Sequence, residues 1–253
     1  MQNLLFDCNE FKVTRTGNAG LANLAQRPTN IKPIYFSKEH YQMLLLEAQQ
    51  EIGQLQEMLY AHNRYAVLLI FQGMDSAGKG GVIKHVMSGI NPQGCQVFSF
   101  QQPSLEELDH DFLWRSNKCL PERGRIGIFD RSYYEEVITV RVMPDLLKQQ
   151  HLPLECIDPK KIWVERFQDI VNLEHYLHRN GIQVIKFFLH LSKEEQRQRL
   201  IARIDEPSKN WKIGRADLEA HKHWEAYQLA YNECIDATSA HHAPWYVIPA
   251  DDK

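Results

Sequence analysis

A glycine-rich turn that follows an apolar run places the strongest constraint on how this chain folds. The run at 68–71 leads into residues that fit the pattern Gly-x-x-x-x-Gly-Lys. In this pattern the glycines let backbone N–H groups approach phosphate oxygens, and the lysine reaches the outer phosphates. The sequence therefore predicts a strand, a phosphate-binding turn and a helix in succession. The predicted phosphate-binding residues of the turn are Gly73, Met74, Ser76, Ala77, Gly78 and Gly80, and Asp75 and Lys79 are its predicted catalytic residues.

Two residues of this turn depart from the common pattern. Position 80 is ordinarily Ser or Thr, whose hydroxyl binds magnesium, but here it is Gly80. Asp75 instead places a carboxylate inside the turn, where it would repel bound phosphate unless a divalent cation lies between them. We therefore expect the metal site to have moved to the carboxylate of Asp75.

Length and charge limit the remaining classes of protein. A chain of 253 residues with a net charge of −3 fits one large α/β domain and has no overall basic footprint for nucleic acid. The five cysteines are scattered and form no Cys-x-x-Cys pair, so neither zinc nor a disulfide framework is expected. The longest apolar run, 66–71, is too short to span a membrane, and no signal peptide is evident. We expect a cytoplasmic protein.

The order of predicted elements indicates a doubly wound parallel sheet of α/β class. Five β-rich runs alternate with helical stretches, at 66–71, 96–100, 126–129, 184–191 and 245–248. Residues 1–36 lack a sustained period and predict an extended arm, which leaves 37–253 as the main domain. Helical stretches at 193–204 and 215–237 are interrupted at 207–214, which predicts a helical lid over about 193–237.

Capping residues predict where several helices begin and end. Two Ser–Glu pairs have the spacing of a capping box: Ser104 with Glu107, and Ser192 with Glu195. The dipeptide Asp158-Pro159 indicates the start of a helix that Asn180-Gly181 ends. An amphipathic helix is expected over 37–62, packed on the sheet or on another subunit, and it leads us to expect a homo-oligomer.

An acidic residue at the end of the third predicted strand completes the candidate site. Asp130 follows the run 125–129, as in the second half of a nucleoside triphosphate site, although an aspartate there is often only a cap. Parallel strands bring their carboxyl ends to one edge of the sheet, so Asp75 and Asp130 are expected to hold one or two magnesium ions together. Arg131 is predicted to stabilise the transferring phosphoryl group, or to pair with an aspartate in the empty site.

Cations in the predicted lid form a second candidate group. Arg199 and Arg203 lie one helical turn apart and predict a clamp on phosphate, supported by Lys209, Lys212 and Arg215. Lys84, a little over one turn beyond Lys79, is either a groove residue for an extended anion or a surface residue, and the sequence leaves both readings open. The histidines have no partner acids at metal-binding spacing, so no zinc site is predicted.

With these residues in place, the chain closely resembles the family-2 polyphosphate kinases. The resemblance begins at Pro33 and rests on the runs 73–81, 85–95, 130–136, 203–212 and 245–251. The runs at 87–95 and 130–136 are similar to the class III branch, whose members phosphorylate nucleoside monophosphates and diphosphates from polyphosphate. Two departures are the segment 14–29, which fits the family poorly, and the end at Lys253, beyond which family members usually continue.

The resemblance implies a thymidylate-kinase-like P-loop fold with a five-stranded parallel sheet, and reversible transfer between inorganic polyphosphate and adenine nucleotides, with guanine nucleotides as a further class. It implies Mg²⁺ as cofactor, with Mn²⁺ as the alternative ion. Asp75 and Asp130 match the catalytic or metal-holding aspartates, Lys79 and Arg131 match phosphate binders, and Arg199 and Arg203 fall in the lid helix. Glu136 or its neighbour Glu135 matches the nucleotide side.

Two other functions share much of this sequence pattern. An ATP-dependent nucleoside monophosphate kinase has the same loop and lid, and only the missing hydroxyl at Gly80 speaks against it. A nucleotide-binding regulator without turnover is the second alternative, which the combination of both aspartates, Lys79 and the lid arginines opposes. Donor and acceptor assays separate the three.

Overall fold

A five-stranded parallel sheet forms the centre of the molecule, in the order β2-β3-β1-β4-β5. The computed structural model describes residues 7–13, 22–212 and 214–252, apart from the side chains at 212, 215 and 216. The strands are β1 Ala66–Gly73, β2 Cys95–Ser99, β3 Ile126–Asp130, β4 Ile182–His190 and β5 Trp245–Pro249. This arrangement confirms the predicted α/β class and its parallel sheet.

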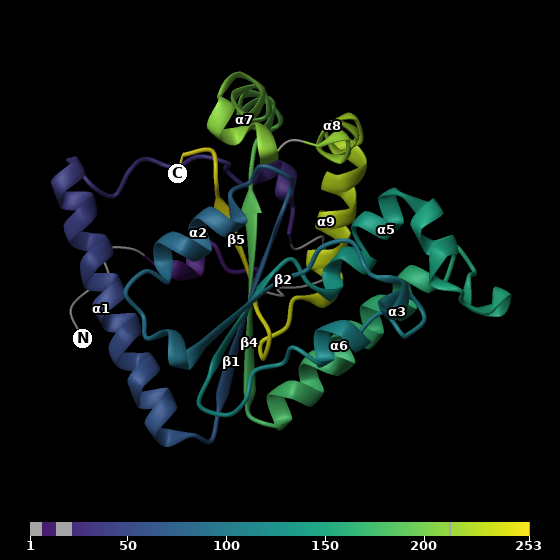
Figure 1. The fold of residues 1–253 in the computed structure, drawn as a ribbon, viewed down its shortest axis with the longest axis horizontal. Helices are drawn as coiled ribbons and strands as arrows, with labels where there is room; N and C mark the ends of the chain where they lie inside the picture. The colour runs from purple at the N-terminus through teal and green to yellow at the C-terminus, as the bar shows by residue number, and fades with distance from the viewer. Residues whose placement is uncertain (1–6, 14–21, 213, 253) are drawn as a thin grey trace.

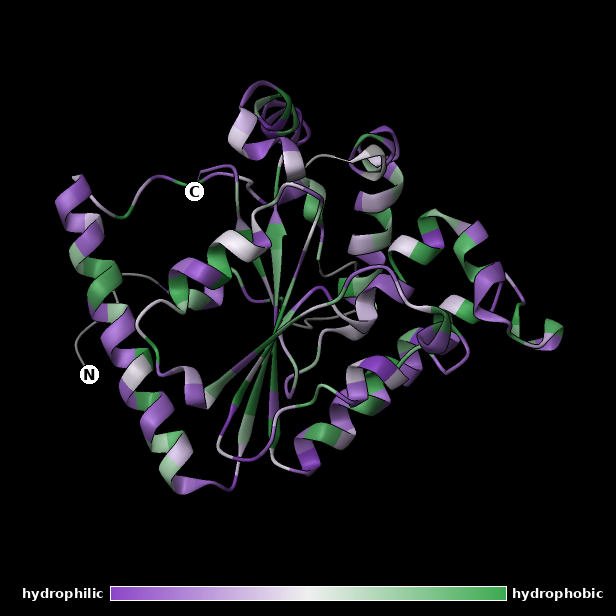
Figure 2. Cartoon of the chain, in the orientation of Figure 1, coloured by the Kyte–Doolittle hydropathy of each residue, from purple (hydrophilic) through white to green (hydrophobic). Residues whose placement is uncertain are grey.

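The central strands β1 and β3 are nearly continuous apolar runs because both of their faces are covered. Leu68 and Ile70 of β1, Ile128 of β3 and Phe188 of β4 have no exposed surface. Figure 2 shows the strands mostly in the colour of hydrophobic residues, whereas the helices around them carry hydrophilic segments. The core therefore lies on the two faces of the sheet, and the candidate site residues lie at the carboxyl ends of its strands.

Helices lie on both sides of this sheet and beyond one end of it (Figure 1). On one side are α1 Lys38–His62 and α2 Lys79–Val86, and on the other are α6 Ile162–Arg179 and α9 Trp224–Thr238. Beyond the carboxyl ends of the strands stand α7 Lys193–Asp205 and α8 Arg215–Lys222. Short α-helices are α3 Leu105–Leu108, α4 Trp114–Asn117 and α5 Thr139–Val142. Short 3-10 helices are η1 Cys8–Glu10, η2 Leu24–Gln26, η3 Pro92–Gly94, η4 Tyr133–Glu136, η5 Pro144–Gln150, η6 Leu154–Cys156 and η7 Pro207–Lys212.

Several predicted helix ends agree with the structure and one does not. Ser104 and Glu107 form a complete capping box at α3, and the Ser192 side chain accepts from Glu195 N at α7. The predicted start of α6 at Asp158 is wrong, because the Asp158 side chain accepts from Lys160 N and holds a turn there. The helix begins only at Ile162.

The second helical stretch of the expected lid is two helices with different roles. It breaks at His223 into α8 and α9. The α9 helix buries Trp224, Tyr227 and Tyr231, and therefore belongs to the core. Of the described helices in the expected lid, α7, η7 and α8 stand beyond the strand ends and α9 does not. Lys212 and Arg215, two of the expected lid cations, lie outside the described side chains.

The described parts of the N-terminal arm pack on the body. Val13 N donates to Trp245 O at 2.9 Å and Val247 N donates to Phe11 O at 2.8 Å, so this segment pairs with the edge strand β5. Ala22 and Leu24 are buried as well. Residues 1–6 and 14–21 of the expected arm lie outside the described residues.

The long helix α1 contacts the body sparingly. Ser37 caps it by accepting from His40 N, and Gln56 is its one buried residue. A Cβ at Gly94 would lie only 1.7 Å from Gln56 Nε2, so Gly94 is where α1 approaches η3 most closely. The predicted homo-oligomer stays a prediction. In the described part of the chain, no helix combines the length and apolar character that a membrane crossing requires.

Candidate active site

The turn between β1 and α2 has the backbone geometry of an anion cradle. Gly73 and Gly78 have φ angles of 156° and 101°, and Ser76 has a φ of 67°. A Cβ at Gly73 would lie 3.0 Å from the carbonyl oxygen of Leu189, so glycine is required there. No side chain caps the N-terminus of α2, which leaves its N–H groups for a bound anion.

Lys79 is folded over this turn. Its side chain is 8% exposed, and Nζ donates to Gly73 O at 2.7 Å and to Met74 O at 3.4 Å. Burial lowers the pKa of Lys79 and the charge of Arg131 lowers it further, while Asp75, Glu135 and Asp130 raise it. The lysine is therefore held at the point where the turn, two aspartates and an arginine meet.

Asp75 and Arg131 form an ion pair across the strand ends. Arg131 Nη2 lies 2.7 Å from Asp75 Oδ1, and both side chains remain partly exposed. Arg131 has a φ of 65°, and its N–H donates to Phe71 O at 3.1 Å, which fixes the turn after β3 against β1. Burial alone would lower the pKa of Arg131, but Glu135 and Asp75 raise it above its usual value. The pairing of Arg131 with an aspartate, one of the two predicted roles of this residue, is present in the structure.

Asp130 reaches the same edge of the sheet from β3. Its Cα is the register partner of Phe71, two residues before the end of β1. Asp130 Oδ2 lies 3.5 Å from the position that a Cβ at Gly80 would occupy. The Asp130 carboxylate thus faces the position where the common loop pattern has its hydroxyl.

The two aspartates supply the hard oxygen donors that Mg²⁺ prefers. Among the described residues, no three acidic, histidine or cysteine side chains converge as a metal site. A magnesium ion usually takes one or two protein carboxylates and completes its shell with phosphate oxygens and water. The residues present therefore fit a divalent ion that arrives with a phosphate ligand.

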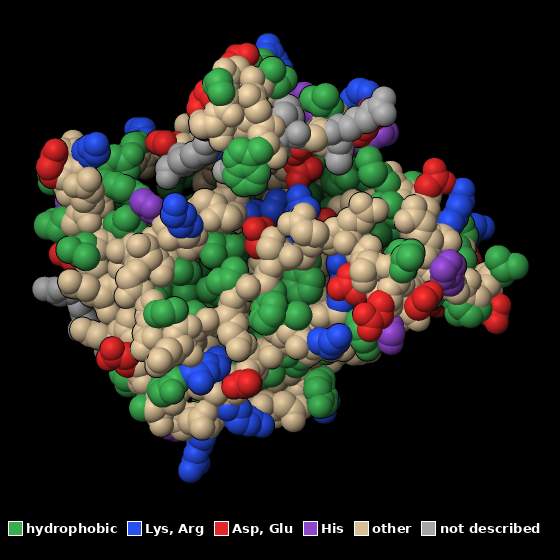
Figure 3. Space-filling model, viewed as in Figure 1, with side chains coloured by type: hydrophobic (Ala, Val, Ile, Leu, Met, Phe, Trp, Pro, Cys, Tyr) green, Lys and Arg blue, Asp and Glu red, His purple; other side chains and the backbone are tan. Residues whose placement is uncertain are grey.

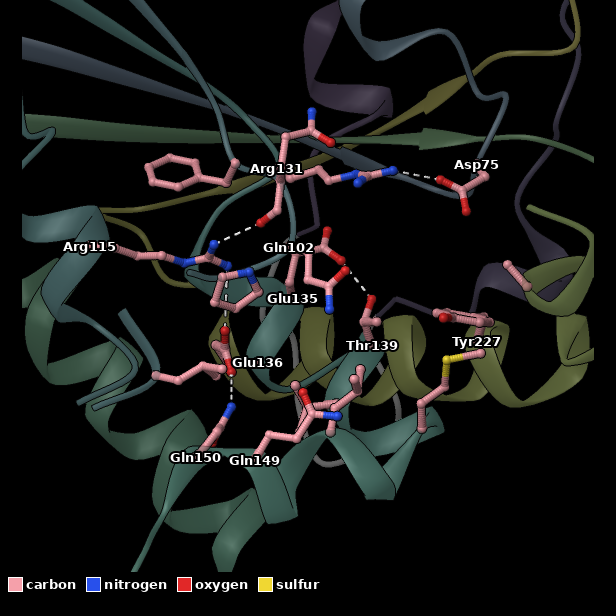
Figure 4. Close-up of a pocket in the computed structure, with 18 of the residues that line it drawn as sticks. Asp75, Gln102, Arg115, Arg131, Glu135, Glu136, Thr139, Gln149, Gln150 and Tyr227 are labelled. Carbon is pink, nitrogen blue, oxygen red and sulfur yellow. Dashed lines mark hydrogen bonds and ion pairs between the residues drawn. The ribbon is translucent and has the colours of Figure 1, made fainter. Parts of the chain in front are cut away.

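A cavity of about 320 Å³ opens beside the loop. Figure 4 shows Asp75 and Arg131 at one end of it and Glu136, Gln149 and Gln150 at the other. Figure 3 shows acidic and basic side chains together in the hollow below the top of the molecule, where Figure 1 places α7. The cavity of about 320 Å³ is lined by Gly73, Met74, Asp75, Phe100, Gln101, Gln102, Pro103, Leu108, Arg115, Arg131, Glu135, Glu136, Thr139, Val140, Met143, Leu146, Gln149, Gln150, Ala220, Tyr227 and Tyr231.

Glu135 and Glu136 both line this cavity but have different surroundings. Glu135 Oε2 accepts from Thr139 Oγ1 at 2.6 Å, and its charge acts on Arg131. Glu136 is buried, and burial raises its pKa, while Arg166 and Arg115 lower it. Both residues therefore lie beside the cavity, as the nucleotide-side prediction requires.

Four of the lid and groove cations expected to meet phosphate have described side chains, and three of these are engaged elsewhere. Arg199 is buried and donates to four backbone carbonyls and to Glu195, so it is not presented as a phosphate clamp in this structure. Arg203 pairs with Asp217 of α8 at 3.0 Å, and Lys209 pairs with Glu206 at 2.6 Å. Lys84 is exposed on α2, which leaves both readings of it open. The expectation for Arg199 came from helical spacing, which does not show which face is buried.

Several residues that shape the site have no local sequence signal. Arg115 Nη2 lies 3.5 Å from Glu136 Oε1, and Arg166 Nη1 lies 3.7 Å from Glu136 Oε2. Gln150 Nε2 donates to Glu136 Oε2 at 2.6 Å. Tyr227 lines the cavity, and burial raises its pKa to about 12. Their role depends on chain segments that meet only in the fold.

Comparison with known proteins shows what this chain is similar to. The model of a family described as Polyphosphate kinase 2 matches residues 35–253. An ADP-polyphosphate phosphotransferase of Rhodopseudomonas palustris is 57% identical over 242 residues, which is 96% of this chain and 84% of the relative. An AMP/ADP-polyphosphate phosphotransferase of Meiothermus ruber is 43% identical over 80% of this chain and 71% of its own length. The crystal structure of polyphosphate kinase 2 from Arthrobacter aurescens TC1 superimposes with a TM-score of 0.84 at 36% identity, covering 99% of this chain and 85% of that one.

Proposed function

The chain belongs to the polyphosphate kinase 2 family, and we propose that it moves a phosphoryl group reversibly between inorganic polyphosphate and nucleoside mono- and diphosphates. The names of the relatives from Rhodopseudomonas palustris and Meiothermus ruber support this substrate pair. The observation that carries the proposal is the loop itself. Asp75 places a carboxylate in the loop beside the cavity, and the Asp130 carboxylate faces Gly80, where the common pattern has a hydroxyl.

The two substrates approach the loop from different sides. The N–H groups of the loop and the start of α2 bind the phosphate chain of one substrate. The cavity of about 320 Å³ takes the nucleotide, with its phosphate toward Asp75 and Arg131 and its base toward Gln149 and Gln150. A cavity of this size is within the usual range for a small ligand.

The protein contributes positioning and charge stabilisation to an in-line transfer. Lys79 and Arg131 stabilise negative charge on the transferring phosphoryl group. Asp75 and Asp130 would hold a divalent ion, which we propose is Mg²⁺ with Mn²⁺ as the alternative; when bound, it would neutralise negative charge on phosphate. A nucleotide phosphate is largely ionised near neutral pH, so Asp75 orients the attacking oxygen and need not act as a strong base.

When substrate arrives, the pair between Arg131 and Asp75 must open. Both side chains are partly exposed, 34% for Arg131 and 24% for Asp75, so each can turn toward a ligand. Arg131 then faces the phosphoryl group and the Asp75 carboxylate becomes free for the ion. Before it opens, the ion pair neutralises the Asp75 carboxylate and so reduces its repulsion of an incoming phosphate.

Polyphosphate, adenine nucleotides and guanine nucleotides are the proposed partners, in the cytoplasm. The ATP-dependent monophosphate kinase and the non-catalytic regulator are less well supported, because the named relatives use polyphosphate.

A donor assay tests the proposal. AMP and ADP are each incubated with polyphosphate or with ATP and magnesium, and the products are separated. Products from polyphosphate with both acceptors are expected. If ATP is the only donor and AMP the only acceptor, the protein is the monophosphate kinase. If nucleotide binds but no phosphate is transferred in a single turnover, the protein is the regulator.

A further inference from the structure

The first helix of the lid, α7, forms hydrogen bonds to the carbonyl groups of the phosphate-binding loop through two buried side chains. Gln196 has no exposed surface, and its Nε2 donates to Asp75 O at 2.9 Å. Arg199, one turn later on the same face of α7, is 7% exposed. Its Nη1 donates to Ser76 O and to Ala77 O, both at 3.1 Å. Three consecutive carbonyls of the loop are therefore held by one face of one helix.

The remaining donors of Arg199 tie the loop to the end of the last strand. Nη2 donates to Ala250 O at 2.6 Å and to Asp251 O at 2.9 Å, and Nε donates to Glu195 Oε1 at 2.7 Å. The Asp251 carboxylate in turn accepts from Ser192 N at the start of α7, at 2.7 Å. Hydrogen bonds therefore hold the Arg199 guanidinium to the loop, to the residues after β5 and to Glu195, so that it links these segments rigidly.

Holding these carbonyls orients the face of the loop that meets phosphate. In a trans peptide the C=O and the following N–H point in opposite directions. Fixing the oxygens of Asp75 and Ala77 toward α7 therefore turns the N–H groups of Ser76 and Gly78 away from α7. The intervening N–H, of Ala77, closes the turn by donating to Met74 O at 3.0 Å. Ser76 also has a φ of 67°, a conformation that needs support from its surroundings.

A histidine on the second lid helix fixes the amide of Gln196. His221 Nδ1 of α8 lies 2.7 Å from Gln196 Oε1. The carbonyl of Asp75 only accepts, so the NH₂ group of Gln196 faces it and the amide oxygen faces His221. His221 is then the donor, protonated at Nδ1. The amide links α8, α7 and the loop in one chain of hydrogen bonds.

We propose that Gln196 and Arg199 are positioning residues of the phosphoryl transfer, which orient the phosphate-binding loop from the lid, with His221 setting the orientation of the Gln196 amide. The proposal takes the transfer reaction from the proposed function. The state of the loop itself is measured independently of activity.

The first test replaces Gln196 with leucine and uses Gln198→Leu as the matched control. Gln198 lies on the exposed face of the same helix, and its Nε2 donates to Glu194 Oε1 at 3.3 Å. In Gln196→Leu we expect faster hydrogen exchange in the loop peptide that contains Ser76 to Gly78, and a kcat about tenfold lower, as a misplaced reacting group produces. The KM for nucleotide should stay within about twofold, because the cavity is unchanged. Gln198→Leu should match the wild type in all three measurements.

The second test separates positioning from packing at His221. Asn offers an N–H donor close to the position of Nδ1, whereas leucine offers none, so His221→Asn should retain exchange and kcat and His221→Leu should lose them. The proposal is overturned if loop exchange and kcat are the same in Gln196→Leu and Gln198→Leu, or if the two His221 variants behave alike. If the wild type itself transfers no phosphate, the proposed function fails, and loop exchange still decides whether α7 orients the loop.

Discussion

Arg131 Nη2 lies 2.7 Å from Asp75 Oδ1, although the two residues are 56 positions apart in the chain. The contact joins the loop after β1 to the turn after β3, because these strands are neighbours in the sheet. It places an arginine on the carboxylate that distinguishes this loop from the common pattern. The guanidinium of Arg131 therefore neutralises the carboxylate of Asp75.

Replacing Arg131 with lysine should lower kcat by about tenfold to a hundredfold, because a single ammonium cannot reproduce the planar donor fork of arginine at a transferring phosphoryl group. Steady-state kinetics with saturating polyphosphate measure the change. Arg197→Lys, on the exposed face of α7, is the matched control and should leave kcat unchanged. Equal rates in both variants would contradict the role of Arg131.

Gln149 tests where the nucleotide binds. It lines the far end of the cavity (Figure 4), and losing one hydrogen bond from its amide to the base should raise the KM for nucleotide about fivefold, equivalent to about 1 kcal/mol. Gln149→Ala should leave the KM for polyphosphate unchanged. Gln168→Ala, on the exposed face of α6, controls for loss of an amide elsewhere. A selective rise in the KM for polyphosphate would reverse the proposed placement of the substrates.

A buried network of hydrogen bonds around Lys186 should contribute strongly to stability. Lys186 Nζ donates to Glu174 Oε2 at 2.5 Å, to Tyr134 OH at 3.0 Å and to Thr238 O at 2.9 Å. Burial lowers the pKa of this lysine, and Glu174 raises it. Lys186→Met would leave the Glu174 carboxylate buried without its cation, so we expect a loss of about 3–5 kcal/mol of unfolding free energy.

Denaturant unfolding of Lys186→Met, Glu174→Leu and the double variant completes this test. The double variant should lose less than the sum of the single losses, because removing both charges leaves neither one unpaired. Strictly additive losses would show that the two side chains act independently.

Histidines with lowered pKa values should make the protein less stable in mild acid. Burial lowers the pKa of His242, and the neighbouring His175 and His178 lower it further. The unfolded chain, whose histidines titrate near 6.5, therefore binds more protons than the folded protein as the pH falls through that value. Stability should be full above about pH 6.5 and decline between the unfolded and the lowered folded pKa. Burial lowers the pKa of His190 as well, which acts in the same direction.

Thermal unfolding between pH 7.5 and pH 5 measures this decline. His242→Gln should flatten the pH dependence, and His151→Gln, at an exposed position, should not. A midpoint that stays constant over this range in the wild type would contradict the sign of the effect.

Residues that act within a short run of sequence could be predicted, because the local pattern carries their geometry. The loop at 73–80 and the pair Asp130-Arg131 each follow a strand, and the parallel sheet brings strand ends together without further information. The pairing of Arg131 with an aspartate followed from the same reasoning. The predicted fold class, strands and sheet are confirmed for this reason.

Residues whose role depends on tertiary contacts could not be predicted. Arg199 has the spacing of an exposed clamp, and only the fold shows that two of its partners are carbonyls more than 100 positions away along the chain. The cations around Glu136 come from α4 and α6, which no periodicity links to it. The break at His223 depends on the aromatic face of α9 being buried in the core.

The proposal that Asp75 and Asp130 together hold the ion for transfer from polyphosphate is tested most directly by one assay. Phosphate transfer to ADP is measured for the wild type, Asp75→Asn and Asp130→Asn with magnesium, after unfolding curves show that all three are folded. We expect each amide variant to lose at least about a hundredfold in rate, because an amide keeps the shape but not the charge that would hold the ion. A rate near that of the wild type in either variant would contradict it.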